Sequence, residues 1–130
     1  MFKPEGVYVA MLTPFDEDGS INEGELRRIV DFQIAGGVHG LFPISSAGEF
    51  IHMSRDEKVR MMEIMVDQNK GRVKITPGVG SSLPAESIFL AQKGLDHWRI
   101  FPETLLLHFV FRHPSLLELH FYQGQMPATL

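Results

Sequence analysis

The chain has 130 residues, of which 44% are hydrophobic and 22% charged, as in ordinary globular proteins. Its formal net charge of -4 and its scattered Lys and Arg argue against a nucleic-acid partner, and the absence of cysteine excludes a disulfide framework or a thiolate metal site. No signal-peptide pattern opens the chain and no apolar run approaches the roughly 18 residues of a membrane span, so we expect a cytoplasmic protein with no membrane partner.

The first predicted strand covers residues 6–15, GVYVAMLTPF, because a nearly continuous apolar run is typical of a strand buried on both faces. A turn-rich stretch at 16–20 follows. Asn22 and Glu25 have the spacing of a capping box, so we expect a helix to begin there and to end at Gly36, where the apolar spacing stops. These residues predict a first βα unit.

A second βα unit follows the same order. Residues 40–44, GLFPI, form a short apolar run that predicts a strand, and the small, polar residues 45–49 come directly after it. Ser54 and Glu57 make another capping box, from which an amphipathic helix is predicted to run to about Asn69. Several methionines lie along this helix, and their spacing predicts that they fill the core.

The third unit is predicted from a strand at 73–79 and a helix opened by Pro84. The order βαβαβα with short connections indicates parallel strands joined by right-handed crossovers, either in an open doubly wound sheet or in part of a barrel. Both arrangements place ligand chemistry at the carboxyl ends of the strands, in the loops at 13–15, 45–49 and 78–82. The first of these loops, around Thr13, is expected to be structural.

The character of the sequence changes after Gly94. Residues 95–130 hold four of the six histidines and the single tryptophan, and the apolar run at 105–111 has no clear period, so we assign this tail no fold. The domain boundary is therefore predicted at residue 94. The histidines do not combine with carboxylates at metal-ligand spacing, and no metal site is predicted.

The segment GLFPISSAGEF, with AMLTPF upstream and ITPGVGSS downstream, resembles the dihydrodipicolinate synthase and N-acetylneuraminate lyase family over residues 1–94. The family pattern at the end of the second strand is close to Gly-Thr/Ser-Thr-Gly-Glu, and residues 45–49 occupy those positions. The resemblance implies the first three βα units of a (β/α)8 barrel. Since a complete barrel typically needs about 250 residues, a truncated barrel followed by a non-matching tail is expected.

The resemblance also implies roles for the loop after the second strand. By family position, Ser46 is the proton-relay hydroxyl, and the backbone N–H groups of Ser46 and Ala47 bind the carboxylate of pyruvate or a related 2-keto acid, with Ser45 and Gly48 beside them. Such amides suit an anion, and a hydroxyl can pass a proton. Ala47 departs from the family by lacking the second hydroxyl. From the residues alone, the favoured interpretation is that Ser45 and Ser46 satisfy the loop backbone or cap a turn.

The resemblance further implies a tetrameric lyase that needs no cofactor and forms a Schiff base through a lysine on a later barrel strand. None of the lysines up to residue 94 falls at the carboxyl end of a predicted strand, where burial would favour the neutral amine. We therefore expect a fragment that is inactive alone. The alternative is a non-catalytic binding or oligomerisation remnant that pairs its open sheet edge with a partner.

Two further interpretations concern the tail. Suitable codons for residues 102–109, shifted by one base, read Leu-Lys-Pro-Tyr-Phe-Tyr-Ile, which is close to a Pro-Tyr-Tyr-like strand end of the family and indicates a frameshift from about residue 95. The third functional possibility, an independent open-sheet binding protein, requires this tail to fold as a covering layer.

Overall fold

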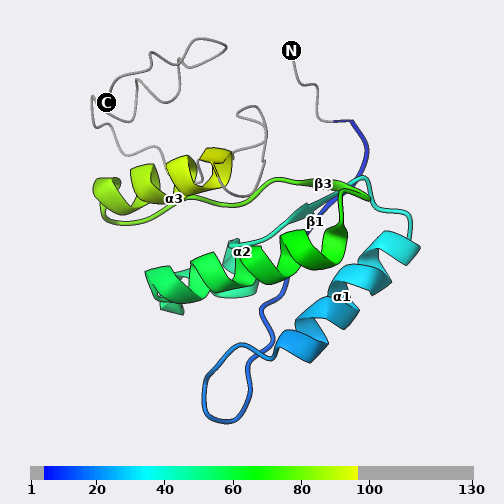
Figure 1. Cartoon of the computed structure of the whole chain (residues 1–130), viewed down its shortest axis with the longest axis horizontal. Helices are drawn as coiled ribbons and strands as arrows, with labels where there is room; N and C mark the ends of the chain where they lie inside the picture. Colours follow the sequence, from blue (N-terminus) through cyan, green and yellow to red (C-terminus); the bar gives the residue numbers. More distant parts are fainter. Residues whose placement is uncertain (1–4, 97–130) are drawn as a thin grey trace.

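A computed structural model describes residues 5–96 of the chain (Figure 1). Three strands alternate with three helices, and two short 3₁₀ helices follow the second strand. The elements are β1 (Tyr8–Ala10), α1 (Glu23–Ala35), β2 (Gly40–Phe42), η1 (Ser46–Gly48), η2 (Phe50–His52), α2 (Arg55–Asn69), β3 (Lys74–Ile75) and α3 (Pro84–Asp96). The predicted order of three βα units is confirmed. Of the predicted tail at 95–130, residues 97–130 lie outside the described residues.

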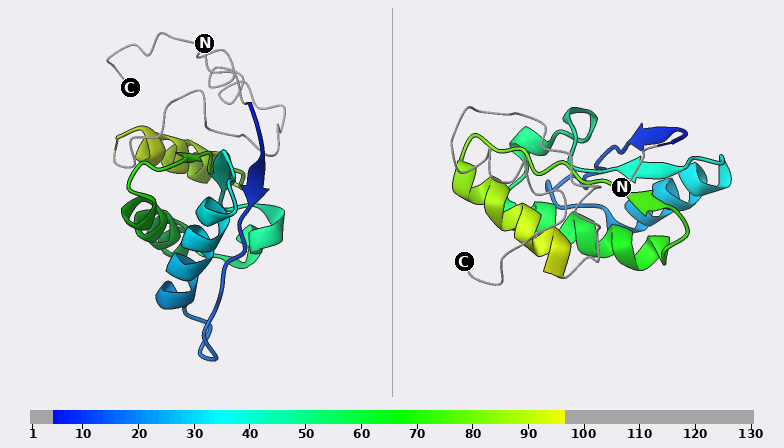
Figure 2. Two further views of the ribbon diagram at one scale, coloured as in Figure 1. Left: turned by 90° about the vertical axis from the view of Figure 1, so that its right-hand side faces the viewer. Right: turned by 90° about the horizontal axis from the view of Figure 1, so that it is seen from above.

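The three strands form one parallel sheet in the order β1-β2-β3. Tyr8 of β1 pairs with Gly40 of β2, and Leu41 of β2 pairs with Ile75 of β3. The two perpendicular views in Figure 2 show α1 and α2 together on one side of this sheet. Each strand thus has one face turned toward the helices.

The strands are shorter than predicted, and β1 is not buried on both faces. Val7 is 61% exposed and Leu12 is 59% exposed, on either side of the three paired residues. The continuous apolar run at 6–15 predicted burial on both faces, which is wrong within the described part of the chain because helices cover one face of β1 only. Apolar content alone does not report which face is covered.

The predicted helix starts are confirmed, with one difference. Ser54 and Glu57 form a complete capping box at the start of α2, since each side chain bonds the backbone N–H of the other residue. At α1, the Asn22 side chain accepts a hydrogen bond from the Glu25 N–H at 2.8 Å, but the Asn22 N–H donates to the Pro14 carbonyl. In the predicted capping box, the Asn22 N–H would donate to the Glu25 side chain. Here it donates to the β1–α1 loop instead.

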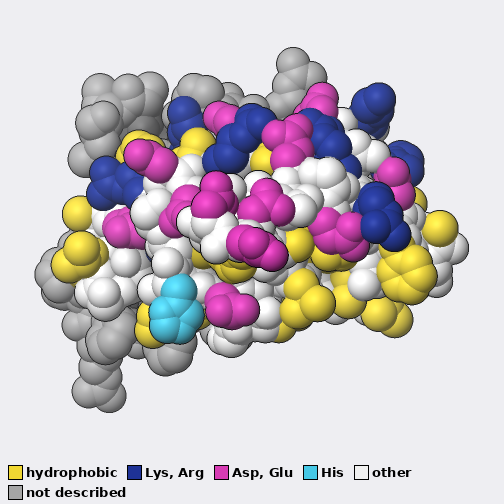
Figure 3. All heavy atoms as spheres, turned by 90° about the horizontal axis from the view of Figure 1, so that it is seen from below, with side chains coloured by type: hydrophobic (Ala, Val, Ile, Leu, Met, Phe, Trp, Pro, Cys, Tyr) yellow, Lys and Arg dark blue, Asp and Glu magenta, His cyan; other side chains and the backbone are white. Residues whose placement is uncertain are grey.

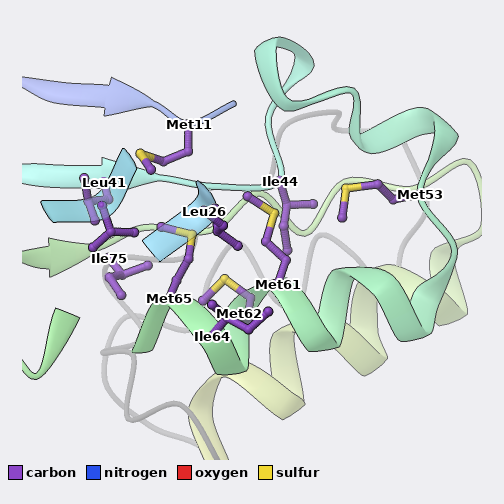
Figure 4. Packing of buried hydrophobic residues seen from close by; sticks show 11 residues of the cluster. Met11, Leu26, Leu41, Ile44, Met53, Met61, Met62, Ile64, Met65 and Ile75 are labelled. Carbon is purple, nitrogen blue, oxygen red and sulfur yellow. The ribbon is translucent and has the colours of Figure 1, made fainter. Parts of the chain in front are cut away.

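The core lies between the sheet and the helices, and methionine dominates it (Figure 4). Met61, Met62 and Met65 of α2 are fully buried, as predicted from their spacing. They pack in the same cluster as Leu41 of β2 and Leu26 of α1. Unbranched, flexible methionines fill irregular space between a sheet and its helices, and α2 supplies three of them to this core.

The outer surfaces of α1 and α2 are joined by charged side chains. Figure 3 shows acidic and basic groups interspersed over one face of the molecule. Arg27 of α1 contacts Glu23 in its own helix and Asp67 of α2, and Arg72 after α2 reaches back to Asp31. The Arg27 and Arg60 guanidinium groups hold the pKa of Glu23 below its usual value. On this face of the described chain, acidic and basic side chains alternate, and the ion pairs link α1 to α2 and to Arg72.

Candidate functional site

The carboxyl ends of the three strands lie at one edge of the sheet. Parallel pairing continues past the strands themselves, because Met11 N–H donates to the Phe42 carbonyl and Gly78 N–H donates to the Pro43 carbonyl, both at 2.9 Å. The loops that follow β1, β2 and β3 therefore leave the sheet side by side. This confirms the predicted convergence of the loops at 13–15, 45–49 and 78–82.

The loop after β2 starts with an unusual backbone conformation. Ile44 has a φ of 55°, in the left-handed region that β-branched residues rarely enter. Its side chain is 2% exposed and packs in the core with Met53 and Met61 (Figure 4). This packing holds the strained conformation, and the reversal that it produces delivers Ser45 and Ser46 to the carboxyl edge. The sequence offered no signal for it, since glycine or asparagine is expected at such a position.

Within the loop, η1 turns Ser46 and Ala47 outward. The Gly48 and Phe50 N–H groups donate to the Ser45 carbonyl at 3.0 and 3.3 Å, and the Glu49 N–H donates to the Ser46 carbonyl. The N–H groups of Ser46 and Ala47 have no acceptor among residues 5–96, and both residues are exposed. Two successive donors are therefore available to an anion at this edge.

The opposite side of the loop is fastened to β1. Thr13 is buried, and its hydroxyl donates to the Gly48 carbonyl at 2.7 Å. A Cβ atom at Gly48 would lie 2.6 Å from the Met11 carbonyl oxygen, so only glycine permits this contact. The Thr13 hydroxyl thus links the end of β1 to the η1 turn.

Ser45 lies between the strained Ile44 and the exposed Ser46. It is 3% exposed, and its hydroxyl has no hydrogen-bond partner in the described part of the chain. The loop after β3 packs beside it, because a Cβ at Gly78 would lie 2.2 Å from the Ile44 carbonyl oxygen. The burial of Ser45 was not predicted, since the sequence places it in a polar run.

The described lysines lie away from this edge. Lys58 of α2 forms a buried ion pair with Glu86 of α3 at 2.8 Å. Lys74 begins β3 at the opposite end of the strand, Lys70 caps the end of α2 and Lys93 lies on α3. No amine among residues 5–96 occupies the carboxyl end of a strand, in agreement with the positions predicted from sequence.

Among the other titratable groups of residues 5–96, His39 makes a contact between strands. His39 Nδ1 accepts a hydrogen bond from the Val7 N–H at 3.0 Å. This bond links the residues that directly precede β1 and β2. Residues 5–96 contain no cluster of three or more His, Asp or Glu side chains able to hold a metal. None of the described helices is long and apolar enough to cross a membrane.

Comparison with known proteins gives a family for this loop and fold. The Dihydrodipicolinate synthetase family matches residues 3–97, well over half of the chain. The 4-hydroxy-tetrahydrodipicolinate synthase of Methanosphaera stadtmanae is 40% identical over 92 residues, a match that covers 71% of this chain and 31% of that protein. The chain thus spans about a third of the length of the curated relatives that it matches.

Solved structures agree with this assignment. The N-acetylneuraminate lyase of Mycoplasma synoviae superimposes with a TM-score of 0.69 at 29% identity, over 73% of this chain and 33% of that one. The N-acetylneuraminate lyase of Fusobacterium nucleatum, complexed with pyruvate, gives a TM-score of 0.63 at 40% identity, over 66% and 30%. The parallel sheet and its helices match the N-terminal part of the family's barrel, and the chain belongs to the Dihydrodipicolinate synthetase family.

Proposed function

We propose that this chain supplies the carboxylate-binding part of a pyruvate-dependent Schiff-base lyase. The observation that carries the proposal is the pair of exposed N–H groups of Ser46 and Ala47 at the carboxyl edge of the sheet, which have no acceptor among residues 5–96. Successive backbone amides of this kind bind anions, and the pyruvate carboxylate of a family substrate has the matching charge. The pyruvate complex of the Fusobacterium nucleatum relative supports the choice of ligand.

The proposal gives the Ser46 side chain the role of acting on the keto acid. It is exposed beside its own N–H group, so a carboxylate on the two amides would lie next to its hydroxyl. A hydroxyl can both donate and accept a proton, as a relay to the keto oxygen requires. Ser46 is therefore assigned the proton-relay role, while Ser45 and Gly48 complete the loop that holds the carboxylate.

The imine-forming lysine is assigned to a barrel strand outside residues 5–96. Each described lysine is committed to an ion pair, a helix or the amino end of a strand, where it does not reach the loop edge. By this proposal the chain forms no imine alone and works as a fragment of a cytoplasmic, tetrameric lyase. The second substrate is not assigned, because its contacts belong to other loops.

The test is borohydride reduction with pyruvate, followed by intact-mass spectrometry. One sample holds the full chain alone, and a second adds the remaining two thirds or so of the Fusobacterium nucleatum lyase as a separate polypeptide. We expect an adduct only in the mixture, on a lysine of the added polypeptide. Ser46→Ala should slow its formation about 100-fold or more, as for loss of a proton-transfer group. A specific adduct on the chain alone would overturn the assignment of the lysine.

A second candidate function is a non-catalytic binding or oligomerisation role. The observation that favours it is the outer edge of β1, which pairs with no other strand of residues 5–96 and is flanked by the exposed Val7 and Leu12. An apolar, unpaired strand edge is a template for pairing with another chain. In the mixture described above, a stable complex without any pyruvate adduct would favour this role over the catalytic one.

A further inference from the structure

We propose that the Ser45 hydroxyl replaces the one that Ala47 lacks and donates a hydrogen bond to the bound ligand carboxylate. The inference rests on the proposed function, because the ligand is the carboxylate assigned to the amides of Ser46 and Ala47. It assigns a residue at which the family pattern has glycine. The hydroxyl pair of the loop is thus displaced by one position, from residues 46 and 47 to residues 45 and 46.

The first observation is the condition of the Ser45 side chain. The residue is 3% exposed, yet its hydroxyl has no partner among residues 5–96. Buried hydroxyl groups in folded proteins nearly always have a hydrogen-bond partner, and those that lack one are candidates for ligand contact. Ser45 directly precedes the two exposed amides, so a ligand bound on those amides lies next to its backbone.

The second observation is that the backbone of Ser45 is held rigidly. Its carbonyl accepts hydrogen bonds from Gly48 and Phe50, and the preceding Ile44 is locked in the left-handed region by its burial in the core. A hydroxyl on such a residue is preorganised, and a ligand does not have to order it on binding. Ser45 is therefore a binding residue with a fixed position, in contrast to the exposed Ser46.

The third observation concerns where unsatisfied hydroxyl groups occur. Within residues 5–96, the two buried side-chain oxygen or nitrogen atoms without a partner are those of Ser45 and Thr76. Thr76 follows β3 directly, and its N–H donates to the Leu41 carbonyl of β2. Both hydroxyl groups thus belong to the carboxyl edge, where the ligand is proposed to bind.

The experiment is a titration of the full, ¹⁵N-labelled chain with sodium pyruvate, in which the amide signals of Ser46 and Ala47 give the dissociation constant. We expect Ser45→Ala to weaken binding about tenfold, the usual effect of losing a hydrogen bond to a charged group. The double variant S45A/A47S should restore the wild-type constant. Ser20→Ala, which removes an exposed hydroxyl in the β1–α1 loop, is the matched control and should bind as wild type.

The outcomes separate this inference from the proposed function. Pyruvate that shifts neither amide in the wild-type chain overturns the proposed function, and the inference with it. Wild-type binding with an unchanged constant in Ser45→Ala overturns the inference alone. Ala47→Ser is an independent test. If the Ser45 hydroxyl already binds the carboxylate, a hydroxyl added at residue 47 should change the dissociation constant for pyruvate less than twofold. A tenfold gain in affinity would show that the Ser45 hydroxyl does not bind the carboxylate.

Discussion

Individual residues determine the position of the exposed backbone N–H groups in the loop after β2. Ile44 accepts a left-handed conformation that costs on the order of 1–3 kcal/mol, and its burial among methionines offsets that cost. Gly48 allows the loop to approach β1, and Thr13 fastens it there. The amides of Ser46 and Ala47 are therefore exposed because the residues around them are fixed.

Thr13→Val tests this fastening. It removes the hydroxyl that donates to the Gly48 carbonyl and leaves a buried carbonyl without its partner, so the free energy of unfolding should fall by about 1–3 kcal/mol. Thr76→Val is the matched control, because the Thr76 hydroxyl has no hydrogen-bond partner among residues 5–96 and its removal should be nearly neutral. Urea unfolding of both variants measures the difference, and equal costs would contradict the role given to Thr13.

At the scale of elements, α2 connects the parts of the fold. Its methionines fill the core, and Arg60 on its surface forms an ion pair with Glu23 of α1. Lys58 forms a largely buried ion pair with Glu86 of α3. The Lys58 and Glu86 side chains are 6% and 15% exposed. The position of α3 thus depends on one desolvated pair in addition to its apolar contacts.

Lys58→Met should lower the free energy of unfolding by about 3–5 kcal/mol, because the Glu86 carboxylate is left buried without a counter-charge. Replacing both residues, as K58M/E86L, should recover most of that loss. The control is Arg28→Met, which breaks an exposed pair with Glu25 and should cost less than about 1 kcal/mol. A cost for Lys58→Met no larger than that of the control, in urea unfolding, would refute the importance of the pair.

The start of α2 predicts a dependence of stability on pH. The Ser54 hydroxyl and N–H hold the pKa of the Glu57 carboxyl below its usual value. Because the folded-state pKa is the lower one, the stabilisation is complete above the unfolded pKa of about 4.3 and is lost as the pH falls through the folded pKa. Thermal unfolding at pH 6 and pH 3 should show a smaller loss for Glu57→Gln than for wild type, by about 0.3–1 kcal/mol. Identical losses would rule out a contribution from Glu57.

At the scale of the whole molecule, the sheet has an unpaired edge on each side within the described residues. The N–H of Met11 points to β2, so by strand alternation the N–H of Ala10 points away from it, toward the outer edge of β1. Exposed Val7 and Leu12 flank that edge. An unpaired strand edge of this kind is a template for pairing with a further strand.

Ala10→Pro tests the outer edge of β1. Proline removes the outward N–H without breaking the β1–β2 ladder, so it should block pairing at this edge and leave only pairing through β3. In sedimentation velocity over a range of concentrations, wild type should form species larger than dimers, whereas the variant should stop at dimers. Ala10→Val keeps the N–H and should behave as wild type. A wild-type chain that stays monomeric throughout would contradict open-edge pairing.

The sequence by itself determined the local features of the protein. The helix starts at Asn22 and Ser54, the end of α1 at Gly36 and the opening of α3 at Pro84 depend on neighbouring residues, so their patterns could be read directly. The order of the elements and the meeting of the loops at one edge followed from chirality and parallel pairing. The boundary predicted at residue 94 falls within α3, which continues to Asp96.

Only the tertiary structure decided the features that depend on distant residues. The left-handed Ile44 is held by a core drawn from other elements, and the buried Ser45 hydroxyl and the Lys58–Glu86 pair exist because loops and helices far apart in sequence pack against them. The exposure of one face of β1 likewise depends on where the helices lie. Burial and strain are set by non-local packing, which no local pattern of residues encodes, and they are the properties that give this loop its proposed chemistry.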